Sequence, residues 1–129
     1  MVATVNTRTL ENSARNLVQQ FTFWTTGVDV ETNVVKVNAV TLGLSTNPCH
    51  TKVRRIKWVT SGAIDVRIQW DGATPTDIAI LEYWGVLDFS DTEGIWNDAT
   101  TPTGNIIFST FATSANNGYS ITLYMVKGI

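Results

Sequence analysis

The segment from Ile64 to Asp71 alternates strictly between apolar and polar residues, reading IDVRIQWD. Successive side chains of a β-strand point to opposite faces, so a period of two predicts a strand with one buried and one wetter face. The same period recurs over residues 17–24, 33–40, 54–60 and 119–126. The side chains expected to point into a core are Leu17, Phe21, Phe23, Val35, Val37, Ala39, Ile56, Trp58, Ile64, Val66, Ile68, Trp70, Tyr119, Ile121, Leu123 and Met125.

Turn-forming residues separate these apolar runs. They are Ser61–Gly62, Asp71–Gly72, Gly85, Gly94, Pro102–Gly104 and Asn116–Gly118. Glycine and asparagine tolerate positive φ and proline fixes φ, so each cluster favours a tight connection. About seven or eight short strands without a helical period after residue 17 predict an all-β fold, an antiparallel β-sandwich resembling a jelly roll. An up-and-down barrel is the alternative.

The stretch VRIQWDGATPTDIAILEYWG predicts a hairpin in more detail. We expect Asp71 and Gly72 to start its turn and Pro75 to lie at the tip. Ile78 and Ile80 would then return along the partner strand. Asp71 and Asp77 are accordingly predicted to be turn and strand-end residues.

Residues 1–16 are polar and lack a sustained period, so we expect an extended N-terminal arm outside the core. A short helical turn within residues 9–18, capped by Thr9, is predicted there. Residues 17–129 would form a single β-sandwich domain, since 129 residues are enough to bury one core.

Charged residues make up only 16% of the chain, and the net charge is -2. A weakly charged surface is typical of a protein that contacts other proteins. The basic run at 52–57 lies in an alternating pattern, so its charges would divide between two faces and disfavour nucleic-acid binding. No apolar run approaches the ~20 residues that span a membrane. With one cysteine and no apolar leader, we expect folding in a reducing cytoplasm.

No motif points to catalysis, a cofactor or a metal. Cys49 and His50 are adjacent in a Pro-containing loop, whereas a zinc site needs about four ligands and a nucleophile needs a base within hydrogen-bond reach. The acidic run at 88–94 places Phe89 and Thr100 at ligand positions of a calcium-binding EF-hand, where neither residue fits. We expect a solvated turn, with an ion held between loops as the alternative.

The tryptophans leave carbohydrate binding as an alternative function. Trp58 and Trp70 fall on apolar faces, while Trp84 and Trp96 lie near turns and could form an exposed platform. Glycoside hydrolysis would need two acids about 5–10 Å apart. Asp71, Asp77, Glu82 and Asp88 could supply them, but the pattern does not place them together.

The order of several short motifs resembles small virion proteins of tailed bacteriophages. The motifs are Ile56–Trp58, Asp65–Asp71, Asp77–Leu81, Gly85 with Asp88–Phe89, Gly104–Thr110 and Gly118–Lys127. The resemblance covers roughly residues 52 to 128; the N-terminal arm and the Cys-Pro loop lie outside it.

This resemblance implies a non-enzymatic structural protein of the virion, assembled in the bacterial host cytoplasm. We expect a capsid decoration (cement) protein that binds the major capsid protein and copies of itself as a trimer or dimer. A tail or neck component is the alternative, and neither nucleic acid nor a membrane is an expected partner. The residues predicted to make these contacts are Leu10, Arg15 and Leu17 for docking, and Trp84, Phe89 and Trp96 for subunit or shell contact.

Overall fold

A computed structural model describes residues 3–27, 29–42, 51–61, 63–89, 91, 94–112 and 115–127. These residues form β-strands and connecting turns, with no α-helix among them. The strands are β1 (Thr4–Asn12), β2 (Asn16–Thr25), β3 (Val34–Val37), β4 (Lys52–Ser61), β5 (Ile64–Thr74), β6 (Thr76–Leu81), β7 (Trp84–Asp88), β8 (Ile95–Trp96), β9 (Thr100–Ala112) and β10 (Asn117–Val126).

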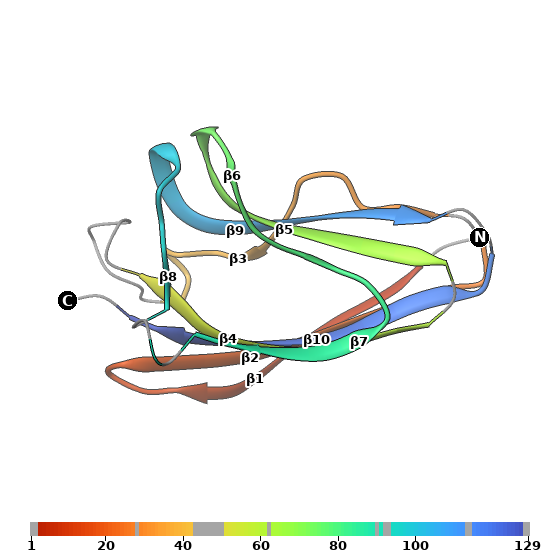
Figure 1. Cartoon of the computed structure of the whole chain (residues 1–129), viewed down its shortest axis with the longest axis horizontal. Helices are drawn as coiled ribbons and strands as arrows, with labels where there is room; N and C mark the ends of the chain where they lie inside the picture. The colour runs from red at the N-terminus through yellow and green to blue at the C-terminus, as the bar shows by residue number, and fades with distance from the viewer. Residues whose placement is uncertain are drawn as a thin grey trace.

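Two antiparallel sheets face each other (Figure 1). Sheet A has the order β1-β2-β10-β4-β7, with the short β8 also paired to β4. Sheet B has the order β3-β9-β5-β6. Without β1 and β8, this is the strand order of a jelly roll, in which two Greek keys share two packed sheets. The expected antiparallel sandwich is therefore the observed fold.

The core lies between the sheets, where the alternating segments predicted it. All four apolar residues of the Ile64–Trp70 segment are buried, and Trp70 is fully inaccessible. The inward set of β10, from Tyr119 to Met125, is buried too. Phe108 of β9 meets Phe21 of β2 edge to face, with ring centroids 5.2 Å apart, so aromatic packing joins the two sheets.

The hairpin between β5 and β6 turns later than predicted. β5 continues through Asp71 and Gly72 to Thr74, and Pro75 lies between the two strands. Gly72 serves a different purpose, because a Cβ there would lie 2.5 Å from the carbonyl oxygen of Thr100 on β9. Glycine is required at position 72 because the backbone of β9 approaches it closely at a bulge, and not because the chain turns there.

The N-terminal arm is a strand of sheet A, and the helical turn predicted within residues 9–18 is wrong. β1 pairs antiparallel with β2 from Thr4 opposite Trp24 to Asn12 opposite Leu17. Every residue of β1 is exposed, so the segment lies outside the core as expected. The predicted boundary at residue 16 falls on the first residue of β2.

The alternation predicted for residues 33–40 is interrupted. The pairing of β3 with β9 shifts register between Val35 and Val37. As a result Val35 is 45% exposed, although Val37 is fully buried. The side chain of Lys36, predicted to face solvent, is only 4% exposed and pairs with Glu31.

Candidate functional site

The outer face of sheet A carries a row of aligned side chains from three strands. Trp84 of β7 lies opposite Val59 of β4, which lies opposite Ser120 of β10. Directly opposite residues of paired strands project from the same face of a sheet. The next aligned row consists of Val86, Lys57 and Thr122.

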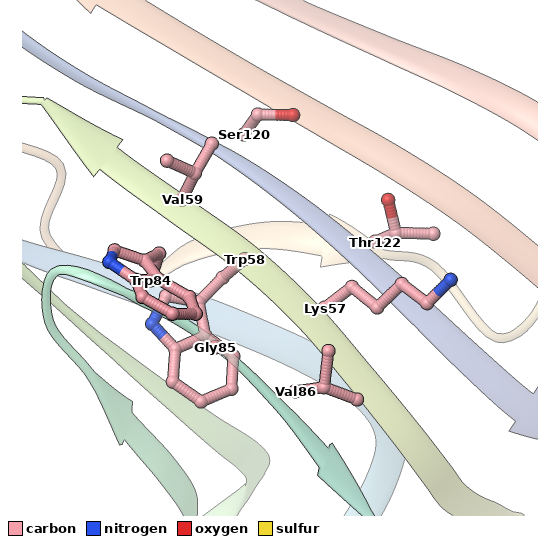
Figure 2. A pocket seen from close by; sticks show the side chains of 8 residues that line it. All are labelled: Lys57, Trp58, Val59, Trp84, Gly85, Val86, Ser120 and Thr122. Carbon is pink, nitrogen blue, oxygen red and sulfur yellow. The ribbon is translucent and has the colours of Figure 1, made fainter.

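These rows form an open groove of about 410 Å³, the Trp84 groove (Figure 2). Its lining residues are Lys57, Trp58, Val59, Trp84, Gly85, Val86, Ser120 and Thr122. Trp84 is 77% exposed, whereas Val59 and Val86 are each about half exposed. Three apolar side chains uncovered together on a sheet face are typical of a contact surface.

The position of Trp84 is set by the residues around it. Gly85 leaves room for the Trp58 ring, since a Cβ at Gly85 would lie 2.8 Å from that ring. The Trp58 Nε1 donates to the carbonyl oxygen of Glu82 at 3.0 Å, which holds the connection before β7. Tyr83 turns that connection with a φ of 61°. The indole of Trp84 therefore projects from a fixed backbone.

A second hollow of about 160 Å³ adjoins the Trp84 groove at Val59 and Ser120. It reaches Trp24 of β2, which is 46% exposed. Gly118 of β10 has no side chain to fill it, and a Cβ there would lie 2.7 Å from the Trp24 ring. An exposed tryptophan thus stands on either side of the central strands β4 and β10.

Three cations gather around Tyr124 farther along the same face; we name Arg54, Arg55, Lys57 and Tyr124 the Tyr124 cluster. The cationic groups lie 5.9 Å (Arg54), 5.5 Å (Arg55) and 5.6 Å (Lys57) from the ring centroid. These distances suit cation–π attraction. The Nε atoms of both arginines have no hydrogen-bond partner among the described residues. Asp88 contributes a carboxylate 4.0 Å from Arg55 Nε.

The expected division of the basic run between two faces is wrong. The pairing of β4 with β10 shifts register at Tyr124, and the extra residue, Arg54, joins Arg55 and Lys57 on one side. The strands of sheet A carry five basic residues and two acidic ones. The absence of a nucleic-acid partner, expected partly from that division, stays a prediction supported only by the net charge of -2.

The structure places three of the predicted contact residues beside β4. Trp84 pairs with Val59, Trp96 pairs with Lys52, and Phe89 donates its backbone N–H to the carbonyl of Arg54 at 2.8 Å. Trp96 is 46% exposed, and the Lys52 ammonium lies 4.0 Å from its ring centroid. Phe89 is half-buried against the core.

The other three predicted contact residues lie across the sheet. Leu10 is exposed at the bulge of β1, and Arg15 is exposed in the turn that follows. Leu17 is fully buried in the core. Its role in docking is therefore corrected: an inward residue of β2 has no side-chain surface to offer a partner.

The sequence pattern does not predict the Tyr124 cluster, because an unbroken alternation places Arg54 on the opposite face from Arg55 and Lys57. An aromatic residue at an outward position of β10, next to a basic run, was the available signal. Cys49 and His50 lie outside the described residues, as do Ser90, Thr92 and Glu93 of the acidic run. Within the described ranges, no three His, Cys, Asp or Glu side chains gather as a metal site would require. No helix in those ranges is long and apolar enough to cross a membrane.

No family model and no curated protein matches this chain. Among solved structures, a cupin superfamily protein from Desulfitobacterium hafniense is 14% identical, over 93% of this chain and 77% of that one, with a TM-score of 0.34. A protein of Bacillus endospore appendages, a family of disulfide-linked pili, is 9% identical over 92% of this chain and 94% of that one, with a TM-score of 0.42.

An oxalate oxidase is also 9% identical, over 96% of this chain and 51% of that one, with a TM-score of 0.42. At these TM-scores the similarities carry no inference about function. The jelly-roll assignment depends on the strand order of the chain itself.

Proposed function

We propose that this protein is a non-enzymatic structural component of a bacteriophage particle, a capsid decoration protein that binds the major capsid protein through the outer face of sheet A. The observation that carries the proposal is the Trp84 groove lying beside the Tyr124 cluster on one sheet face. The order of sequence motifs supplies the link to phage virions. Jelly rolls also recur in viral capsid proteins, which is support by analogy of fold alone.

The chemistry of this face suits a protein partner. Exposed tryptophan and arginine are the residues that most often dominate binding energy in protein interfaces. Lys57 belongs to both the groove and the cluster, so apolar and cationic contacts would be made together. A partner surface that offers an apolar patch beside carboxylates is therefore the best match.

Binding to purified capsid shells tests the proposal. Trp84→Ala should weaken binding at least tenfold, because an interface aromatic is lost. Arg55→Gln should weaken binding and reduce its sensitivity to salt. Ile80→Ala is the matched control, since Ile80 is 63% exposed on sheet B. Unchanged binding of Trp84→Ala and Arg55→Gln would overturn the proposed surface, and absence of the protein from purified virions would overturn the phage role.

A place in the neck or tail is the alternative within the particle. Decoration covers the whole shell and needs far more copies than a neck or tail component. Quantitative densitometry of purified virions against the major capsid protein separates the two positions.

Carbohydrate binding is the second candidate, and the Trp84 groove favours it. The exposed indole of Trp84 lines one side of the groove, and the hydroxyls of Ser120 and Thr122 line the other side, across β4 (Figure 2). Stacking and hydrogen bonding of this kind are what a sugar ring requires. Concentration-dependent quenching of tryptophan fluorescence by host polysaccharide, lost in Trp84→Ala, would support this function. A glycan array without hits would remove it.

A further inference from the structure

β1 leaves one edge of sheet A open. It pairs with β2 on one side, and no strand in the described part of the chain covers its other side (Figure 1). All nine of its residues are exposed, including Val5 and Leu10 at about half of their surface. An edge strand presents unpaired backbone N–H and C=O groups, which another strand can satisfy.

From Thr4 to Thr9 this edge carries little of the usual protection against pairing, because Arg8 is the one charged residue there and the bulge follows at Leu10. Proteins block edge strands with proline, bulges, short length or inward charges. β1 contains no proline or glycine and pairs regularly with β2 from Thr4 to Thr9, before the register shift at Leu10. A side-chain hydrogen bond from Gln19 Nε2 to Thr9 Oγ1 at 3.1 Å holds the strand in place. The edge from Thr4 to Thr9 is therefore regular, and it is already formed in the single chain.

The other edges of the fold are poor templates for a second copy. The opposite side of sheet A ends in β7, with five residues, and β8, with two. In sheet B the edges are β3, with four residues, and β6, with six. Head-to-tail pairing of β1 with one of these would leave matching edges free and build an open fibre. Antiparallel pairing of β1 with β1 closes the contact around a two-fold axis.

We propose that two copies of this chain associate through β1, which pairs antiparallel with β1 of the second copy around Thr7. This register uses the regular stretch from Val5 to Thr9, with Thr7 opposite Thr7 of the second copy. It places Asn6 opposite Arg8 of the second copy, and no like charges face each other. Centring on Arg8 would oppose two arginines, which destabilises a sheet pair.

The pairing would join both copies of sheet A into one continuous sheet. A two-fold axis perpendicular to a sheet keeps both outer faces on the same side. Two Trp84 grooves and two Tyr124 clusters would therefore face one partner surface, and modest contacts would add through multivalency. The dimer does not depend on the phage role, so either proposal can fail alone.

Sedimentation of the full chain tests the proposal. The wild-type chain should show a concentration-dependent monomer–dimer equilibrium. Thr7→Lys and Thr7→Glu should each weaken dimerisation at least tenfold, because equal charges would meet at the axis. An equimolar mixture of the two variants should recover the dimer, because lysine would then face glutamate. Thr74→Lys, at an exposed position of β5 in sheet B, is the matched control and should leave the dimer unchanged.

Several results would overturn the dimer. A chain that stays monomeric at every concentration, or forms a trimer, contradicts it. So does a dimer that tolerates both Thr7 variants, or a mixture of the two that fails to recover. Urea unfolding of each variant, followed by tryptophan fluorescence, verifies that the monomers remain folded, and the two opposite charges provide independent tests of one position.

Discussion

The edge strands β1 and β3 are held to the rest of the fold in different ways. Each borders its sheet on one side only, β1 next to β2 and β3 next to β9. Side chains of β9 and β10 hold β3 and its flanking residues in place, whereas β1 pairs with β2 alone among the described strands and its other edge is open. The difference indicates that β3 is anchored by its own chain, whereas β1 can accept another strand.

A buried polar network holds the edge strand β3 in place. Glu31 pairs with Lys36 and accepts a hydrogen bond at 2.5 Å from the hydroxyl of Tyr119 on β10, across the sandwich. The side chains of Lys36 and Glu31 are 4% and 8% exposed. Three β9 side chains also accept hydrogen bonds from backbone N–H groups flanking β3. These are Glu31 N to Thr110 Oγ1, Asn33 N to Ser109 Oγ and Ala39 N to Asn105 Oδ1.

The largest effect is expected from breaking the buried ion pair. Glu31→Gln would leave the Lys36 ammonium buried without its counter-charge, which costs about 3–5 kcal/mol of unfolding free energy. Chemical denaturation measures this loss. Asp77→Asn is the control, because Asp77 pairs with Arg67 at 2.7 Å on the exposed face of sheet B and should cost far less. Equal losses would show that the buried ion pair does not hold β3 in this way.

The pH dependence of stability should reveal the same network. Burial and the Glu31 carboxylate raise the pKa of Tyr119 well above its usual range. The folded protein therefore keeps this proton where the unfolded chain releases it. Stability is fully present below the unfolded pKa of about 10 and falls above it by about 1.4 kcal/mol per pH unit for one group. In Tyr119→Phe, the unfolding free energy should decline less steeply above pH ~10. Urea unfolding at a series of pH values measures this decline, and the same slope in the wild type and the variant would contradict the role of Tyr119.

A smaller loss of stability is expected from removing a side chain of β9 that accepts a hydrogen bond from a backbone N–H beside β3. Ser109 accepts a hydrogen bond from Asn33 N at 2.9 Å, and its hydroxyl lies 3.2 Å from Asn33 Oδ1. Ser109→Ala should cost about 1–2 kcal/mol of unfolding free energy, because two partly buried hydrogen bonds with Asn33 are lost. Ser120→Ala, at a half-buried position of the outer face, is the comparison and should cost less.

The smallest effect on folding is expected at the open edge. Thr7→Ala should change the unfolding free energy by no more than about 0.5 kcal/mol, since Thr7 lies exposed on the surface. Denaturation at low protein concentration isolates the monomer. A loss as large as that of Ser109→Ala would mean that β1 supports the fold as much as the hydrogen bonds beside β3 do.

Much of the fold could be predicted from residue periodicity. A period of two identified β5 and β10, because each has one face on the core and one wetter face. The same reasoning failed at β1, where both faces are exposed and no alternation can arise. It also failed at the bulges near Lys36 and Arg54, since one extra residue transfers a side chain to the other face.

The candidate site was only partly predictable for the same reason. The exposure of Trp84 and Trp96 was anticipated from their places near turns. The Tyr124 cluster requires knowledge of which strands are neighbours, because β4 and β10 are far apart in sequence. Strand pairing of this kind is set by tertiary structure and cannot be deduced from local patterns.

Hydrogen exchange of the backbone amides measures the open edge most directly. On raising the protein concentration through the dimerisation range, half of the amides between Thr4 and Thr9 should exchange at least tenfold more slowly, because strand pairing protects alternate N–H groups. The amides of Glu31 and Asn33 should exchange at rates independent of concentration, since Thr110 and Ser109 already accept their hydrogen bonds. Exchange over Thr4–Thr9 that does not change with concentration would contradict the proposal that β1 is an edge built for pairing.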